Sequence, residues 1–330
     1  MANNTLAEIR ARLAAAEQNK NQTDSSLFPF WNAKQGTTSI VRFLPDLNPD
    51  NGFFWVEKLT IRLPFNGIKG GNNKEIYVNV PCVEMWKSEY PQGCPILSDV
   101  RAWYKDSSLT ERANRYWKKP TYILQGFVRE SAVLDEEVPE NPIRRFVLNK
   151  QLYNLVKAGI LDTDMDNSPV DYENGSDFRI IKTSKGTYDD YGTSSFARKE
   201  TSLTKSEREA IEKWGLSDLS SFMGKKPTAD DLKIIREMFE ASVDGEAYDT
   251  ERWGKYYRPI GMQADTTSDA PNHSESVSSS EAASKHTSGH VSSSSNTTKN
   301  SDTDSRVSST TKSSAADVLK SIRERASQSK

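Results

Sequence analysis

Short runs of alternating apolar and polar residues, rich in β-branched and aromatic side chains, recur through the middle of the chain. Clusters of Gly, Pro, Asn and Asp separate these runs. A period of two is typical of strands with one buried face, and many short strands divided by turns are typical of a small barrel or sandwich. The pattern predicts six strands, at residues 38–44, 53–63, 75–80, 121–129, 144–148 and 178–183.

Three longer segments have the 3.6-residue period of amphipathic helices, at residues 151–161, 204–213 and 228–241. The second and third begin with a Thr that is followed three residues later by an acid, which predicts a capping box at each start. The predicted fold is therefore mainly β with helices (α+β), and we assign its core to residues 23–262.

The pattern of residues 1–22 predicts that they form a helical N-terminal arm. Apolar residues form one helical stripe with two arginines beside it. Because so short a helix is marginal in water, we expect it to order against a partner surface and to serve self-association. The residues that carry this prediction are Leu6, Ile9, Arg10 and Arg12.

Residues 263–330 are predicted to form a disordered tail. They contain 21 serines, no aromatic residue, and eight acidic residues balanced by eight basic ones. Such a segment buries too little apolar surface to offset the entropy of ordering. A possible terminal helix at 314–328 repeats the arm's L-x-x-I-R-x-R pattern, at 319–325 against 6–12. Either short basic amphipathic helices simply look alike, or the two segments dock on the same surface.

Composition limits the chemistry of the core. All three histidines lie in the tail, so residues 1–262 lack the side chain on which nucleophilic triads and most zinc sites depend. Two cysteines in 330 residues favour a reducing, cytosolic setting over a disulfide scaffold. No apolar run approaches the roughly 20 residues of a membrane span, and the first residues lack the pattern of a signal peptide.

Residues 101–129 combine seven basic and two acidic residues with six aromatic ones, in a chain whose formal net charge is −2. Cations follow a phosphate backbone, and flat rings stack on unpaired bases of any sequence. The alternative is a basic surface over a core that happens to be aromatic. The binding hypothesis selects Arg115, Tyr116, Lys118, Lys119 and Tyr122 from this segment.

Two groups of side chains in the chain could bind a metal ion, but each also has a simpler interpretation. Cys82 and Cys94 provide only two ligands, with Leu97 at the second position of a C-x-x-C pair, so we expect buried free cysteines and no zinc or other cofactor. Asp162, Asp164 and Asp166 resemble part of a calcium loop, but residue 167 is not Gly and the segment fits an acidic turn. The same aspartates could hold magnesium for a nuclease, which is the enzymatic alternative.

Several segments occur in the order found in one known family. They are T-S-I-V-R-F-L-P at 38–45, Cys82, C-P at 94–95, Y-W-K-K at 116–119 and G-T-Y-D-D-Y at 186–191. Together they resemble the single-stranded DNA-binding, helix-destabilising proteins of T-even-like tailed bacteriophages. The resemblance covers roughly residues 28–200, and the division into arm, core and tail is similar too.

The resemblance implies an OB-fold core with a basic, aromatic-lined cleft. Arg42 and the Lys118/Lys119 cluster would contact phosphates. An arm docking on the neighbouring protomer would make binding cooperative, and the tail would engage phage replication and recombination proteins in the cytoplasm of the infected bacterial host. The rings that would line the cleft are Tyr90, Tyr104, Tyr188 and Tyr191.

The chain departs from the family in three ways. The family's zinc ligands are one His and three Cys, of which only Cys82 and Cys94 have counterparts here. The arm has arginines on a helix in place of the family's basic run followed by Ser/Thr, and the tail is neutral where the family's is acidic. The sequence predicts a non-enzymatic, cooperative coat of single-stranded DNA in phage replication, recombination and repair. An RNA-binding translational regulator remains the non-enzymatic alternative.

Overall fold

The computed structural model describes residues 25–71, 73–134, 138–260 and 262, which form six α-helices and an antiparallel sheet of eight strands. Hydrogen-bonded neighbours run β3-β2-β4-β1-β6-β7, with β5 also paired to β4 and β8 to β6. The mixed fold that the sequence predicts is confirmed. This strand order is that of an open sheet, so closure into an OB-type barrel stays a prediction.

The six predicted strands overlap β1 to β6, and two further strands were not predicted. β7 is three residues long, and the outward positions of β8 are charged or polar, so neither presents a clear apolar alternation. The strands are β1 (Thr37–Leu44), β2 (Val56–Phe65), β3 (Ile76–Pro81), β4 (Lys119–Glu130), β5 (Ile143–Leu148), β6 (Gly175–Lys185), β7 (Tyr188–Asp190) and β8 (Ser195–Thr201).

All three predicted helices are present, and both capping boxes form. Thr204 caps α5 and Thr228 caps α6, each with its side chain bonded to the backbone N–H three residues on. Among the described residues, no helix is both long and apolar enough to cross a membrane. The helices are α2 (Pro95–Trp103), α3 (Thr110–Tyr116), α4 (Lys150–Ile160), α5 (Lys205–Trp214), α6 (Ala229–Asp244) and α7 (Thr250–Trp253).

The core that the sequence assigns to residues 23–262 divides into two compact units. We call the described residues of 25–59 and 119–225 the sheet unit, and those of 60–118 and 226–262 the helical unit. β2 begins in the first unit and continues into the second, where its later residues pair with β3. The predicted arm (Leu6, Ile9, Arg10, Arg12), the tail and the terminal helix lie outside the described residues.

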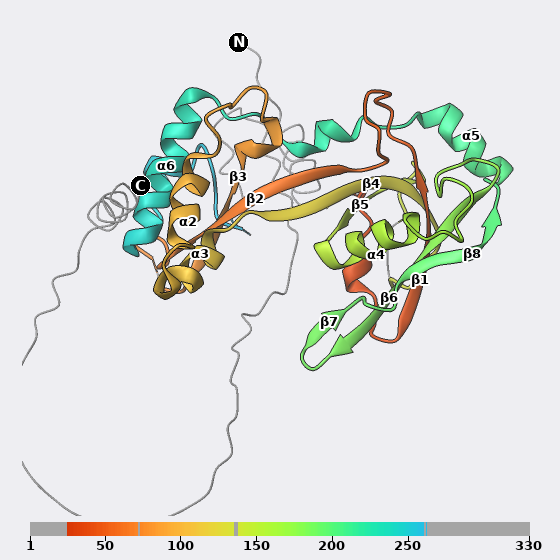
Figure 1. The fold of residues 1–330 in the computed structure, drawn as a ribbon, viewed down its shortest axis with the longest axis horizontal. Coiled ribbons are helices and arrows are strands. Elements are labelled where there is room, and N and C mark those ends of the chain that lie inside the picture. Colours follow the sequence, from red (N-terminus) through yellow and green to blue (C-terminus); the bar gives the residue numbers. More distant parts are fainter. Residues whose placement is uncertain (1–24, 72, 135–137, 261, 263–330) are drawn as a thin grey trace, which may run out of the picture. The chain divides into compact units, whose positions relative to one another are not determined.

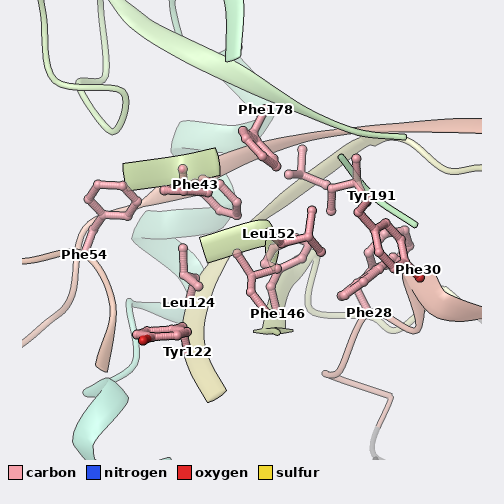
Figure 2. Close-up of a cluster of buried hydrophobic side chains, with 14 residues drawn as sticks. Phe28, Phe30, Phe43, Phe54, Tyr122, Leu124, Phe146, Leu152, Phe178 and Tyr191 are labelled. Carbon is pink, nitrogen blue, oxygen red and sulfur yellow. The ribbon is translucent and has the colours of Figure 1, made fainter. Parts of the chain in front are cut away.

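Phenylalanines fill the core of the sheet unit (Figure 2). Phe43 is fully buried on β1, with ring centroids 5.6 Å from both Phe146 and Phe178. Helix α4 covers this side of the sheet and contributes Leu152. On β4, Gly126 faces Phe43, and a Cβ there would lie 2.1 Å from the carbonyl oxygen of Arg42, so only glycine allows the strands to pair this closely.

Helices α2, α3 and α6 lie side by side in the helical unit (Figure 1). Trp103 on α2 is fully buried, and its ring lies 5.7 Å from Phe239 on α6 and 5.8 Å from Tyr116 on α3. Trp253 packs nearby against Phe65 of β2. Of the seven basic residues at 101–129, Arg101, Arg112 and Arg115 lie on α2 and α3, whose aromatic residues form a core, as the alternative interpretation of that segment expected.

Candidate nucleic-acid interface

The β6–β7 hairpin of the sheet unit places an exposed ring beside a cation. Tyr188 is 40% exposed, and its direct cross-strand partner is the exposed Lys185. Facing residues of an antiparallel pair have Cβ atoms about 5 Å apart, so the phenol and the ammonium can meet the same ligand. Gly186 has φ +66°, the left-handed conformation that tight hairpin turns require.

Tyr104 is the corresponding exposed ring of the helical unit, with 39% of its surface accessible. It ends α2, lies edge-on to Trp117 at 5.2 Å, and donates a hydrogen bond of 2.8 Å to Asn114 Oδ1. Tyr90 is half-buried in the same unit, and its hydroxyl donates to the carbonyl oxygen of Pro227 at 2.5 Å. Both rings are thus held in position by hydrogen bonds from their hydroxyl groups.

Two of the basic residues predicted to bind DNA are already paired with carboxylates of the protein. Lys118 donates to Glu84 at 2.6 Å, and Arg115 pairs with Glu75. Burial raises the pKa of Glu84, but its hydrogen bonds with Lys118 and Arg101 lower the pKa more, so the net value is below the ordinary one. Lys118 ends the first segment of the helical unit, and the half-buried Lys119 begins β4 in the sheet unit. A phosphate would have to compete with these carboxylates for Lys118 and Arg115.

Three of the predicted stacking rings belong to the core. Tyr116, Tyr122 and Tyr191 are 4%, 6% and 4% exposed. Tyr122 donates to Glu57 and stacks on Tyr153, and burial raises the pKa of Tyr191 to about 12. A ring covered by its own protein has no free face for a base. The proposed interface therefore omits all three.

Arg42 does not lie where a phosphate could reach it. Its side chain is fully buried, and Nε donates to Asp177 Oδ1 at 2.9 Å. Arg129 donates to the same carboxylate at 2.8 Å and to Glu207 at 2.9 Å, so the two arginines and two acids form one ion cluster, in which Arg42 is fully buried and the other three side chains are partly exposed. Burial raises the pKa of Glu207, but hydrogen bonds from Arg129 and from the backbone of Thr204 lower it below its ordinary value. Arg42 is thus a structural residue, and the predicted phosphate contact is withdrawn.

Cys82 and Cys94 are buried, unbridged and close together at the starts of two helical turns of the helical unit. Cys82 donates its S–H to Cys94, which lowers the pKa of Cys94 and raises that of Cys82. Leu97, at the position of a third zinc ligand, is fully buried. Within the described ranges, no three His, Cys, Asp or Glu side chains gather as metal ligands would.

The acidic turn after α4 is exposed. Asp162, Asp164 and Asp166 all face solvent, and the backbone N–H of Asp164 donates to the carboxylate of Asp162 at 3.1 Å. That bond is typical of a turn in which an Asp side chain accepts from the backbone two residues on. No observation on this turn favours the magnesium-dependent nuclease.

Sequence reasoning missed an aromatic row in the sheet unit. Phe53 is 60% exposed and stacks on Trp55 at 4.7 Å, and Trp55 meets Tyr153 of α4 at 5.6 Å. Residue 53 was predicted to begin a strand, whereas β2 begins at Val56 and leaves Phe53 on the preceding loop. The turn residues just before this F-F-W run could have indicated that the run begins on a loop and not in a strand.

Searches found neither a family model that matches this chain nor a curated protein of matching sequence. The functional inference therefore depends on the residues themselves. Among the residues predicted to bind, the exposed Tyr188 with its cross-strand neighbour Lys185 and the exposed Tyr104 support it. The aromatic row adds rings that the prediction lacked.

Proposed function

We propose that this chain is a non-enzymatic protein that binds and coats single-stranded DNA without sequence preference. The observation that carries the proposal is the Tyr188–Lys185 pair, in which an exposed ring and an exposed cation face each other across a hairpin. A ring can stack on any unpaired base, while a cation beside it can contact the adjoining phosphate. Tyr104, exposed in the helical unit, provides a second ring of the same kind.

The resemblance to the helix-destabilising proteins of T-even-like phages supports the same proposal. It adds an OB-type sheet unit, cooperative self-association through the arm, and contact of the tail with phage replication and recombination proteins. Within this proposal the protein works in the cytoplasm of the infected host, in DNA replication, recombination and repair. The buried Arg42 is a departure from the phosphate contact that the family implies.

The two kinds of contact explain different properties of the proposed binding. Phosphate contacts make affinity depend on salt, with a slope of about −0.7 for each neutralised phosphate of a single strand. Stacking favours unpaired bases, because bases within a duplex are already stacked on one another. Binding to the single strand alone shifts the duplex equilibrium by mass action and requires no nucleotide hydrolysis.

The variants Tyr188→Ala and Lys185→Gln test the proposal by separating the two contacts. Loss of one stacked ring costs roughly 1–3 kcal/mol, so Tyr188→Ala should weaken binding to fluorescein-labelled oligo(dT) by about 5- to 150-fold. Its salt slope should equal that of the wild type, because no cation is removed. Lys185→Gln should reduce the magnitude of the slope by about 0.7. Fluorescence anisotropy at several salt concentrations measures both.

Trp214→Ala is the matched control for this experiment. Trp214 is 39% exposed in the same unit, but Lys213 covers its ring at 4.5 Å and pairs with Glu140. We expect its variant to bind as the wild type does. Equal affinity of the Tyr188→Ala and Trp214→Ala variants, or equal binding of the wild type to duplex, would contradict the proposal. Tighter binding of the wild type to oligo(rU) than to oligo(dT) would favour the RNA-binding alternative.

A further inference from the structure

The aromatic row connects the core of the sheet unit to its surface. The buried Tyr122 stacks on Tyr153 with centroids 3.5 Å apart and planes 4° apart. Tyr153 meets Trp55 edge-on, and Trp55 stacks on Phe53 at an angle of 28°. Each ring therefore holds the next one in place. The row ends at a Phe ring that is 60% exposed and has one face on Trp55.

Hydrogen bonds fix the loop so that Phe53 points outward. Asn51 donates to Asp46 at 2.7 Å and to the carbonyl oxygen of Trp55 at 3.1 Å, and it accepts from the backbone N–H of Phe53 at 3.1 Å. The next residue, Phe54, turns inward and is 8% exposed. A ring held in this way loses little conformational entropy when a ligand stacks on it.

Two lysines flank the row on α4. Lys150 and Lys157 lie three residues before and four residues after Tyr153, so they neighbour it on the helix surface. Both are exposed, and within the described ranges neither forms an ion pair. Carboxylates also occur in the loop and at the start of β2: Asp46 and Asp50 lie on the loop, and Glu57 accepts a hydrogen bond from the hydroxyl group of Tyr122. Flat rings beside exposed cations match a base joined to phosphates.

We propose that Phe53, supported by Trp55 and Tyr153, is a second stacking site that takes an unpaired base of single-stranded DNA, with Lys150 and Lys157 beside the adjoining phosphates. The inference rests on the proposed function and adds to it a subsite on the β1–β2 loop. In the OB-type fold that the resemblance implies, the loop between the first two strands would be one of those that contact oligonucleotides. An uncharged protein segment would also cover an apolar ring, but it would offer no anion to the two neighbouring lysines.

The Phe53→Ala variant tests the subsite, with Leu47→Ala as its matched control. Leu47 lies on the same loop and is 56% exposed, so both variants remove exposed apolar surface, but only one removes a ring. Phe53→Ala should bind oligo(dT) about 5- to 150-fold more weakly than the wild type, while Leu47→Ala stays within about twofold of it. Phe53→Tyr should restore binding, because it keeps the ring. Lys150→Gln and Lys157→Gln should each reduce the magnitude of the salt slope by about 0.7.

The outcomes separate this inference from the proposed function. If the wild type binds oligo(dT) and Phe53→Ala binds equally well, the subsite is overturned while the proposed function stands. The subsite is also overturned, and the proposed function still stands, if Phe53→Tyr binds as weakly as Phe53→Ala. If the wild type does not bind oligo(dT) at all, both fail together. Weak binding confined to the Ala variant, with recovery in the Tyr variant, supports the subsite.

Discussion

Replacing Asp177 by alanine is expected to lower the free energy of unfolding by about 3–5 kcal/mol, because it leaves the fully buried Arg42 without its carboxylate partner. Arg42 is fully buried and Arg129 is 17% exposed, and both donate to Asp177. Without that carboxylate the two guanidinium groups would lie close together in a site that water reaches poorly. Urea unfolding followed by far-ultraviolet circular dichroism measures the loss.

Glu209→Ala is the control for this prediction. Glu209 pairs with Lys205 on α5 of the same unit, and their side chains are 62% and 91% exposed. Exposed helical pairs contribute about 0.3–0.5 kcal/mol, so this variant should unfold almost as the wild type does. If Asp177→Ala cost no more than Glu209→Ala, the cluster around Arg42 would not have the stabilising role assigned to it.

Trp103→Ala is expected to cost about 3–5 kcal/mol of stability in the helical unit, the range for removing a fully buried aromatic ring. Trp103 contacts Tyr116 and Phe239, and the guanidinium of Arg112 lies over its ring at 5.7 Å. The alanine variant would leave a cavity where α2, α3 and α6 meet. Thermal and urea unfolding both report the effect.

Trp103→Phe distinguishes the loss of packing from the loss of the indole N–H. That N–H has no hydrogen-bond partner within the described ranges, so its removal should cost nothing in hydrogen bonding. The Phe variant should therefore lose much less stability than the Ala variant. Equal losses in the two variants would contradict the view that ring packing supplies the stabilisation.

Local patterns predicted most of the fold because they act over a few residues. The capping boxes at Thr204 and Thr228 depend only on a residue three positions away, and both formed as predicted. Helices α2 and α3 were not predicted, because their basic and aromatic residues were interpreted as a binding surface. The division into two units was also not predictable, since each unit is assembled from two separate stretches of chain.

The candidate site was harder to predict because exposure depends on distant parts of the chain. Arg42 pairs with Asp177, 135 residues away, and nothing near Arg42 in sequence indicates that partner. Tyr188 and Tyr191 lie three residues apart, yet the first is exposed while the second packs against Phe30. Phe53 was missed for a different reason, because the start of the strand was predicted three residues too early.

The central claim is that aromatic rings of this protein stack on unpaired bases beside cations, and intrinsic fluorescence tests it most directly. The wild-type chain would be titrated with oligo(dT) at several salt concentrations, with duplex DNA of the same length as the control. The account predicts quenching of tryptophan and tyrosine emission by oligo(dT), weakening steeply as salt rises. Absence of quenching, or equal binding to the duplex, would contradict it.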